Sequence, residues 1–471
     1  MNQSLRAVAS RSGLCLQRQA KPPASPFHSF SHVREMPSDV RSAQSNTRSR
    51  RSQGTRNRRH HLLLLLAFMS LGQAAPPLTF YRDVLPILQD HCQVCHRPGE
   101  IAPMAFVTYA QTRPWAKAIR EAVVERKMPP WLADPHYGHF ANDPSLTQHE
   151  IDVIQTWVAS GSVEGDPKNR PPDPHWTVGW NIGHPDAVLE MTRPFHLPAK
   201  GDVEYQYTII PARFPQDKWV QKIEIRPSAR NAVHHAVAYI RPPGSDWLRD
   251  QPEGVPFGLS LAATKNDVLL VYTPGNSWNE WTPGMAKRIP AGSDIVLQMH
   301  YTTTGKPEDD RTRIGLVFSP SPPEKAVITL QLNNDRFVIP PGDANYRVQA
   351  AGTLPNDALL LSLFPHMHLR GKAFEYEIDG PHGAVDILLK VNHYDFQWQL
   401  NYRLAQPLTL RAGTRLLCAG YFDNSANNPR NPDPSVEVRY GEQSWQEMMI
   451  GFFDVAVPAG VDKQTFFIRP R

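Results

Sequence analysis

The chain has 471 residues, too many for one ordinary domain, and 41% of them are hydrophobic, which is enough for packed cores. Its 46 prolines favour turns and short strands over long helices. The formal net charge is +5, but residues 1–61 hold 12 of the 50 Lys and Arg and only 2 of the 45 Asp and Glu. The remainder is therefore acidic, which argues against a nucleic-acid-binding protein.

Residues 1–75 are predicted to be a leader that ends in a signal peptide. The basic "RNRRH" precedes "HLLLLLAFMSLGQAA", whose apolar core is too short to span a bilayer comfortably. Cleavage after Ala74 would put Gly72 and Ala74 at the two small-residue positions. The Arg-rich stretch before it is unusually long, so either translation starts downstream or "SRR" at 49–51 belongs to a twin-Arg signal. We expect export to the periplasm or the medium, with membrane contact only through an uncleaved signal.

Residues 76–167 are predicted to form a small, mainly helical domain. Apolar residues recur with helical spacing in "LTFYRDVLPILQDHC", and "RPWAKAIREAVVERK" places Trp115, Ile119 and Val123 on one face. A third helix is expected to begin at Ser145, with Gln148 completing a capping box, and to stop at a glycine. This domain is expected to be all-α.

The "CQVCH" at residues 92–96 is the c-type haem attachment pattern, C-x-x-C-H. Cys92 and Cys95 would bind the haem covalently and His96 would be the proximal iron ligand. A thioredoxin-type C-x-x-C lacks the expected βαβ context, and a zinc site lacks two further ligands nearby. The other cysteines, Cys15 and Cys418, provide no disulfide framework.

The second iron ligand is expected from "ERKMPPW", where a Pro-Pro turn follows Met128. Methionine and histidine ligation raises the haem potential and suits electron transfer. Met104 in "IAPMAF" is the rival, and either methionine could instead fill a core. The region resembles exported bacterial cytochrome c domains in which "C-x-x-C-H…K-M-P-P-W" supplies both ligands.

Residues 168–185 form a Pro- and Asp-rich linker. The sequence that follows is typical of many short strands separated by Pro, Gly and Asp. This pattern predicts β-sandwiches or jelly rolls. Because the region is too long for one sandwich, we expect two all-β domains, at 186–322 and 323–471, divided within "SPSPPEK".

Histidine pairs stand out within the β region. In "LFPHMHLRG", strand alternation puts His366 and His368 on one face, where one metal could bind both. In "NAVHHAVAYI", His234 and His235 should point to opposite faces unless the strand bulges or ends there. His300 lies near the polar end of another strand, and each histidine taken alone could be structural.

Together, "VHH", "VLQMHY", "HMH" and "EMM" resemble, in order and approximate spacing, the motifs of the copper type II, ascorbate-dependent monooxygenases. That family includes peptidylglycine α-hydroxylating monooxygenase and dopamine β-monooxygenase, and the resemblance covers about residues 186–471. It implies two jelly-roll copper domains whose two copper ions face each other across an open, solvent-filled cleft. It also implies hydroxylation of a C–H bond by O₂.

The resemblance implies two sets of copper ligands in this sequence. His234, His235 and His300 match the three-histidine copper that relays electrons. His366, His368 and Met448 match the copper where oxygen is activated, and a soft thioether there favours Cu(I). Met449 is the alternative to Met448, although the Glu-Met order favours Met448.

Three positions depart from the peptide-amidating members of that family. Phe364 stands where those enzymes place a substrate-binding Arg, and Ile450 and Phe452 replace an Asn and a Tyr. A small, apolar organic substrate is therefore expected. Cys418 is expected to be a buried free thiol, and the loop at 421–434 is either a surface loop or part of the copper cleft.

The sequence thus predicts an exported haem–copper oxidoreductase with two copper ions and one haem c, in which the haem, ascorbate or another reductant supplies electrons. A redox partner protein could serve as that donor. The alternative is a non-catalytic periplasmic electron-transfer or copper-binding protein, because every ligand would be present in it as well.

Overall fold

The computed structural model describes residues 76–259, 266–379 and 385–461, together with residues 463 and 466. The predicted leader lies outside the described residues. Among the described residues, none of the helices has both the length and the apolar character needed to cross a membrane.

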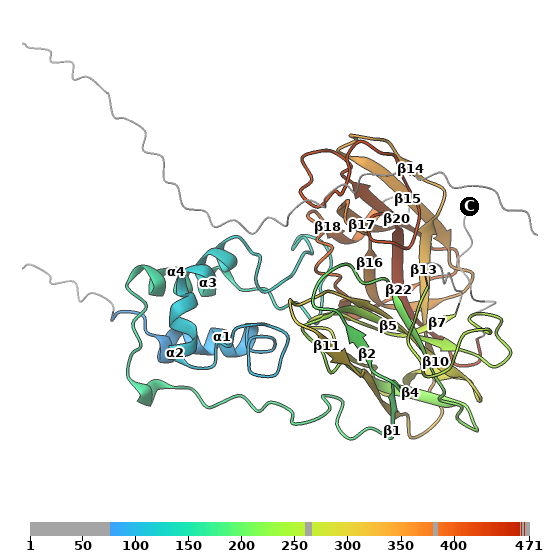
Figure 1. The fold of residues 1–471 in the computed structure, drawn as a ribbon, viewed down its shortest axis with the longest axis horizontal. Coiled ribbons are helices and arrows are strands. Elements are labelled where there is room, and N and C mark those ends of the chain that lie inside the picture. The colour runs from blue at the N-terminus through green and yellow to red at the C-terminus, as the bar shows by residue number, and fades with distance from the viewer. Residues whose placement is uncertain (1–75, 260–265, 380–384, 462, 464–465, 467–471) are drawn as a thin grey trace, which may run out of the picture. The chain divides into compact units, whose positions relative to one another are not determined.

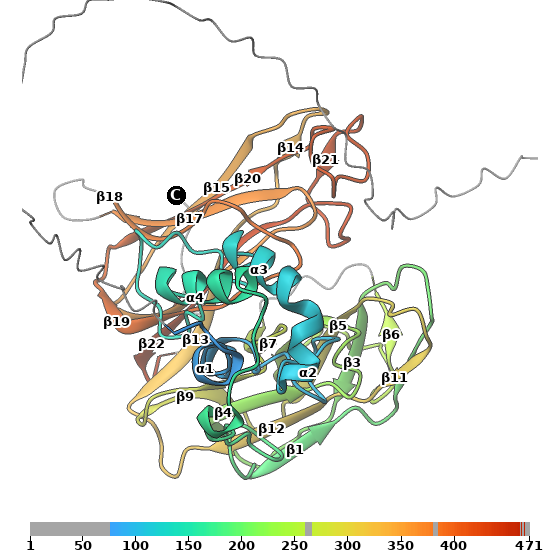
Figure 2. The ribbon, with the colours of Figure 1, turned by 90° about the vertical axis from the view of Figure 1, so that its left-hand side faces the viewer.

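Helices are confined to the first part of the described chain (Figures 1 and 2). They are α1 (Leu85–His91), α2 (Tyr109–Thr112), α3 (Ala116–Val124) and α4 (Gln148–Ala159), with a π-helical turn at Phe80–Val84 and 3₁₀ turns at Arg113–Trp115 and Pro167–Asn169. Their apolar faces share one core, which includes Phe80, Leu88, Ile119, Ile154 and Trp157.

Two details of the predicted helices are wrong. Thr147, not Ser145, caps α4, because its hydroxyl accepts from the Glu150 amide while the Glu150 carboxylate accepts from the Thr147 amide at 2.7 Å. A carboxylate at this position also interacts favourably with the helix dipole, which the Gln148 amide could not do. Trp115 is 42% exposed, since Ala116 takes the buried position at the start of α3.

The remainder is β-structure. The strands are β1 (Ala187–Glu190), β2 (Phe195–Leu197), β3 (Gln206–Ile210), β4 (Lys218–Arg226), β5 (Val233–Arg241), β6 (Phe257–Gly258), β7 (Asp267–Tyr272), β8 (Trp278–Glu280), β9 (Met285–Ile289), β10 (Asp294–Tyr301), β11 (Glu308–Asp310), β12 (Arg313–Phe318), β13 (Lys325–Asn334), β14 (Val338–Ile339), β15 (Tyr346–Thr353), β16 (Ala358–His366), β17 (Gly371–Asp379), β18 (Val385–Val391), β19 (Tyr402–Leu410), β20 (Arg415–Phe422), β21 (Val438–Arg439) and β22 (Met449–Pro458).

The strands form two halves, each with its own hydrophobic core between sheets. In the first half, β6-β3-β10-β5-β7 form one sheet, and β1-β12-β4-β9, with β8 beside β4, form part of a larger one. In the second half, the sheet β15-β20-β17-β18 is matched by β13-β22-β16-β19. This layered, mostly antiparallel architecture is compatible with the predicted β-sandwiches or jelly rolls.

One sheet is continuous across both halves, which the sequence did not predict. The strands β9 and β13 pair in parallel at Met285–Lys325 and Ala286–Ala326. The four-strand sets of the two halves, together with β8 beside β4, therefore form one nine-stranded sheet. The break between β12 and β13 falls at residues 319–324, within the Pro-rich "SPSPPEK".

Lys287 stabilises this junction from a buried position. Its ammonium, on a side chain only 2% exposed, donates to the Val268 carbonyl and the Thr329 hydroxyl, each at 2.6 Å, and lies 3.2 Å from the Asp454 carboxylate. The contacts join β7 and β9 of the first half to β13 and β22 of the second.

Replacing Lys287 with methionine should lower the free energy of unfolding by about 3–5 kcal/mol, because a buried carboxylate and two acceptors lose their partner. Urea unfolding followed by tryptophan fluorescence measures this. Lys306, which is 70% exposed and 3.8 Å from Glu308, is the matched control, and Lys306→Met should change stability by less than about 0.5 kcal/mol. Equal effects of the two substitutions would contradict the buried role of Lys287.

Candidate functional site

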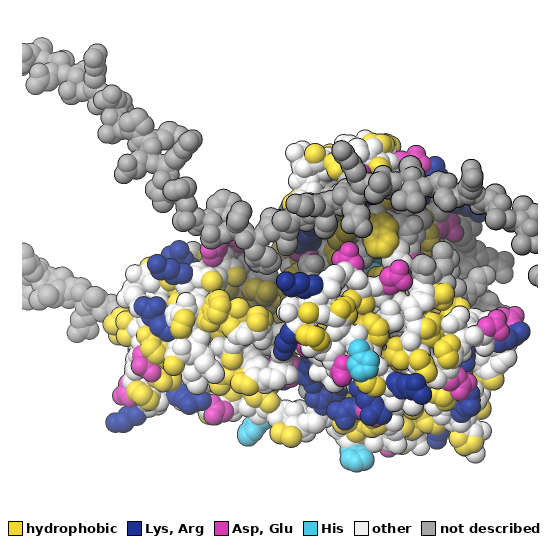
Figure 3. Space-filling view, in the orientation of Figure 1, with side chains coloured by type: hydrophobic (Ala, Val, Ile, Leu, Met, Phe, Trp, Pro, Cys, Tyr) yellow, Lys and Arg dark blue, Asp and Glu magenta, His cyan; other side chains and the backbone are white. Residues whose placement is uncertain are grey.

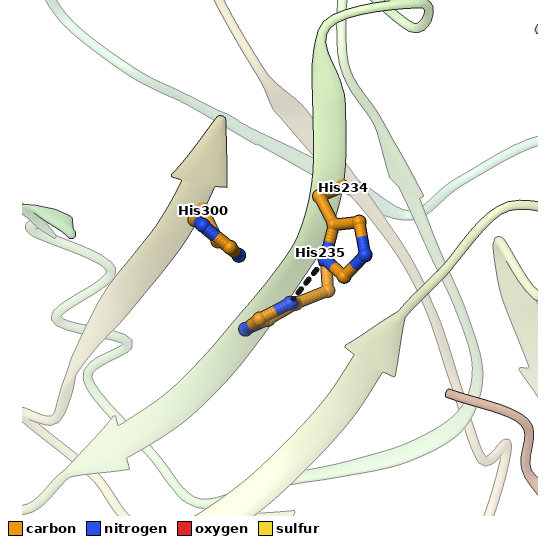
Figure 4. Close-up of side chains that lie close together, drawn as sticks. All are labelled: His234, His235 and His300. Atoms are coloured by element: carbon orange, nitrogen blue, oxygen red, sulfur yellow. Dashed lines mark hydrogen bonds between the residues drawn. The ribbon is translucent and has the colours of Figure 1, made fainter. Parts of the chain in front are cut away.

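Three histidines converge because of a bulge in β5. His300 on β10 pairs directly with His235, but the next pair is Tyr301 with Val233, so His234 is an extra residue in β5. A bulge of this kind rotates one side chain out of the usual alternation. Figure 4 shows the result, in which all three imidazoles point toward one another. One ring nitrogen from each lies within 4.8 Å of the others, a spacing that could hold one metal ion.

Two buried nitrogens in this group have no hydrogen-bond partner among the described residues. They are His234 Nε2 and His300 Nδ1, while Nδ1 of His234 and Nδ1 of His235 lie 3.0 Å apart. An unpaired buried nitrogen costs free energy unless something binds it. The three histidines therefore fit a metal ion that accepts imidazole ligands, as copper and zinc both do.

Aromatic side chains hold these imidazoles in place. Tyr205 stacks on His300 with ring centroids 4.7 Å apart, and Phe396 stacks on His234 at 4.9 Å. Phe396 comes from the second half of the β region, so it also brings the two halves together at the histidines. The sequence carried no signal for either aromatic contact.

His366 and His368 lie on one face, as the strand alternation predicted. Their ring centroids are 5.2 Å apart and the rings are perpendicular, while Met367 between them points into the core with no exposed surface. The Gln399 side-chain oxygen accepts from His366 Nδ1 at 2.7 Å, and the Gln446 carbonyl accepts from His368 Nδ1 at 3.2 Å. Because both acceptors require a protonated Nδ1, each Nε2 is left with a free lone pair for a metal.

The strand register favours Met448 over Met449 at this pair. His366 and Ile450 form the last pair between β16 and β22. If the same register continued beyond the strand ends, His368 would face Met448 and both would lie on the histidine side. Met449 lies on the other side, fully buried in the core, where it approaches Gly420.

A buried carboxylate fixes the backbone around His368. Glu447, which has no exposed surface, accepts from the His368 amide at 3.0 Å and from the Arg370 amide at 2.6 Å. Arg370 is itself 1% exposed and donates to the Asn424 side chain and the Trp445 carbonyl. Asn424 belongs to the loop at 421–434, so this loop braces the His-x-His turn and is not an ordinary surface loop.

The two histidine sets are in contact, which corrects the expected open, solvent-filled cleft. The ring centroids of His235 and His366 lie 6.4 Å apart, and Phe396 lies near both sets, 6.2 Å from His368. His235 is only 4% exposed and His368 only 1%. The shared sheet and Phe396 hold the two halves close enough for the five imidazoles to form one buried cluster.

Burial keeps these imidazoles neutral. It lowers the pKa of His234 and His366 to about 4 and that of His300 to about 3, and it holds the pKa of His235 and His368 well below the ordinary value. Neutral imidazole is the form that binds metals, so the cluster is competent for metal binding at neutral pH.

The metal-free protein should therefore lose stability as the pH falls. The folded-state pKa values lie below the unfolded value of about 6.5, so the unfolded chain binds more protons as the pH drops from about 6.5 toward 4. Thermal unfolding of the metal-free protein should give a melting temperature several degrees lower at pH 5 than at pH 7. A melting temperature independent of pH over that range would contradict the burial of neutral imidazoles.

A small cavity of about 40 Å³ lies at the junction of the β halves, close to His366. Phe364 and Phe452 form part of its lining, and the Phe452 ring is 6.4 Å from that of His366. The far part of the lining is polar, with Lys287, Thr329 and Asn401. The Asn401 side-chain oxygen is buried and has no partner among the described residues.

The C-x-x-C-H segment follows α1. His96 Nδ1 donates to the Met104 carbonyl at 3.1 Å, which leaves Nε2 free as an iron ligand. Cys92 and Cys95 are free and partly buried, and burial raises the pKa of their thiols to about 12 and about 11. These residues fit covalent attachment of a haem.

The two candidate second ligands differ in their surroundings. Met104 packs against the helical core, whereas Met128 follows α3 as a half-buried residue outside that core. This difference favours Met128 as the residue with a sulfur available for a ligand. Cys418, as predicted, is a fully buried free thiol.

No protein-family model matches the sequence, and no curated protein matches it. Among solved structures, the major capsid protein P2 from bacteriophage PM2 aligns with 58% of this chain and 97% of its own, at 8% identity and a TM-score of 0.25. An infectious bursal disease virus VP2 subviral particle aligns with 62% of this chain and 77% of its own, at 10% identity and a TM-score of 0.18. An allantoicase aligns with 49% and 81%, at 9% identity and a TM-score of 0.17. Scores this low carry no argument about function.

Proposed function

We propose that the protein is an exported haem–copper oxidoreductase, a copper-dependent monooxygenase of the copper type II, ascorbate-dependent kind joined to a c-type cytochrome domain. One observation carries the proposal. Five neutral imidazoles lie close together and two of them have unpaired buried nitrogens, while the strand register supports Met448 as a further ligand beside His366 and His368.

Bound copper would supply one-electron redox chemistry and a site for O₂. The protein's own residues would select and hold it: His234, His235 and His300 in one set, and His366, His368 and Met448 in the other. The thioether favours Cu(I), whereas three imidazoles tolerate both oxidation states. Gln399 and the Gln446 carbonyl keep Nε2 of His366 and His368 free and oriented.

Hydroxylation of a C–H bond by O₂ consumes two electrons and two protons and releases one water. Ascorbate or another reductant would supply the electrons, and a haem held by Cys92, Cys95, His96 and Met128 would supply one-electron transfer. The raised thiol pKa values do not oppose this role, because covalent attachment converts the thiols to thioethers.

The side chains beside His366 support a small organic substrate with an apolar part. Phe364 and Phe452 would contact an apolar part of it nearest the histidines, and they would exclude water there. Lys287 is already paired with Asp454 and two acceptors, so it offers no free cation for a carboxylate. This supports an uncharged, largely apolar substrate over a peptide carboxylate.

A second candidate function rests on the contact between the histidine sets. With His235 and His366 only 6.4 Å apart, the five imidazoles could bind copper as one cluster in a non-catalytic electron-transfer or copper-binding protein. Its ligands would be the same, so the distinction lies in turnover.

Oxygen consumption by the copper- and haem-loaded protein tests the proposal. With ascorbate present, a panel of small apolar compounds should include members that stimulate O₂ uptake, with one hydroxylated product formed per O₂ consumed. His366→Ala should abolish the stimulated uptake. Uptake that never depends on an added compound, with copper fully bound, would favour the second candidate.

A further inference from the structure

An ion pair joins the C-x-x-C-H segment to the three-histidine half of the β region. Arg230 Nη1 lies 2.6 Å from Glu100 Oε2, and the other carboxylate oxygen of Glu100 accepts from Arg97 at 2.8 Å. The Arg230 and Glu100 side chains are only 21% and 24% exposed. Arg230 lies in the turn just before β5, four residues from His234. The contact thus links the loop after His96 to the strand that carries two of the histidines.

A hollow of about 120 Å³ opens beside this ion pair, and residues of both segments line it. Val94 and Cys95 contribute from the C-x-x-C-H side, and Val94 is 50% exposed although it is apolar. Arg226 and Tyr272 contribute from the β side. In the space-filling view of Figure 3, Lys and Arg side chains gather on the β region beside the helical segment. The hollow thus combines the exposed apolar Val94 with charged side chains of both signs.

Tyr272 joins this hollow to the strand that carries two of the histidines. It lies at the end of β7, its side chain is 4% exposed, and its backbone pairs with Ala236 on β5. Ala236 directly follows His235, which pairs with His300. One lining residue and one strand pair therefore separate the hollow from the three-histidine site.

We propose that this contact is the route by which electrons enter the three-histidine site, with Glu100 and Arg230 as positioning residues and the backbone pairing of Tyr272 with Ala236 as the intervening path. The proposal rests on the proposed function. His96 would hold the donor iron and the three histidines would hold the acceptor copper, and these groups would supply a transfer of one electron that oxidises ferrous iron and reduces cupric copper. No bond to protein forms or breaks, and an external reductant restores the ferrous state.

The helical segment has a second attachment that does not depend on Arg230. Residues 133–142 bind the second β half through bridges at Ala133–Val391 and Phe140–Leu404, and the Asn142 side chain donates to the Asn401 carbonyl at 2.7 Å. Loss of the ion pair should therefore loosen the C-x-x-C-H side without releasing the segment or unfolding the β region. This makes Arg230 suitable for substitution.

Arg230→Glu in the full, haem- and copper-loaded chain tests the proposal, because it sets two carboxylates against each other. Arg230→Lys keeps the charge, and Arg249→Glu, which alters an exposed ion pair with Asp246 on the same half, is the matched control. Hydrogen exchange of peptides covering residues 94–101 and 272–278 reports docking. Rapid anaerobic reduction of the haem, followed by its optical reoxidation by Cu(II), reports electron transfer.

Arg230→Glu should speed exchange in both peptides and slow reoxidation about tenfold, equivalent to about 1.4 kcal/mol of docking free energy. Arg230→Lys and Arg249→Glu should change the reoxidation rate less than about twofold. A reoxidation rate unchanged in Arg230→Glu, with or without faster exchange, would overturn the route. Metal analysis before mixing distinguishes failure of the route from failure of the proposed function. With copper and haem both bound, an unchanged rate overturns the route alone, whereas a chain with haem but no copper would overturn both.

Discussion

Replacing Met448 with leucine should remove one copper ion per chain and lower substrate-dependent O₂ uptake by more than about 100-fold. Leucine has nearly the same volume but no sulfur, so the substitution deletes a ligand without opening a cavity. The copper bound by His234, His235 and His300 should remain. Metal analysis after gel filtration, together with the copper electron paramagnetic resonance spectrum, distinguishes the two sites.

Met449→Leu is the matched control for this experiment, since Met449 is the first residue of β22 whereas the adjacent Met448 precedes the strand and is half-buried. Met449 is fully buried in the core, and the swap should cost less than about 1.5 kcal/mol of stability and leave both coppers bound. If Met449→Leu lost a copper and Met448→Leu kept both, the register argument at His366 and Ile450 would be wrong.

Glu447→Gln should reduce the free energy of unfolding by about 3 kcal/mol and weaken copper binding at His366 and His368 about 10–100-fold. The amide has one oxygen acceptor where the carboxylate has two, so the His368 or the Arg370 backbone amide loses its buried partner. Urea unfolding and competitive copper titration measure the two effects.

The control for Glu447 is Glu437→Gln, because Glu437 is 52% exposed and pairs with Arg439 on the surface. It should change stability by less than about 0.5 kcal/mol. A Glu447→Gln protein with normal stability but weak copper binding would mean that the carboxylate acts on the site without supporting the fold, contrary to the network described above.

Local rules predicted part of this site from sequence alone. Strand alternation put His366 and His368 on one face, and their rings do lie close together although β16 ends at His366. The same rule could not decide His234 and His235, since their convergence depends on a bulge whose position is set by pairing with β10. The sequence permitted that bulge but did not specify it.

Long-range contacts account for most of what the sequence missed. Glu447 and Arg370 are 77 residues apart, and Phe396 reaches His234 from the other β half, so no local pattern marks either contact. The parallel pairing of β9 and β13 likewise has no local signal, yet it brings the halves together and replaces the expected open cleft by one buried cluster. The prediction of Ser145 as the helix cap was wrong for a local reason, because a second cap pattern that begins at Thr147 overlaps it.

The metal and haem content of the full chain, matured in a periplasm with copper supplied, tests the central claim most directly. We expect two copper ions and one covalently bound haem per chain. A chain that carries covalent haem but no stoichiometric copper would contradict it, because the five buried imidazoles would then be only part of a scaffold.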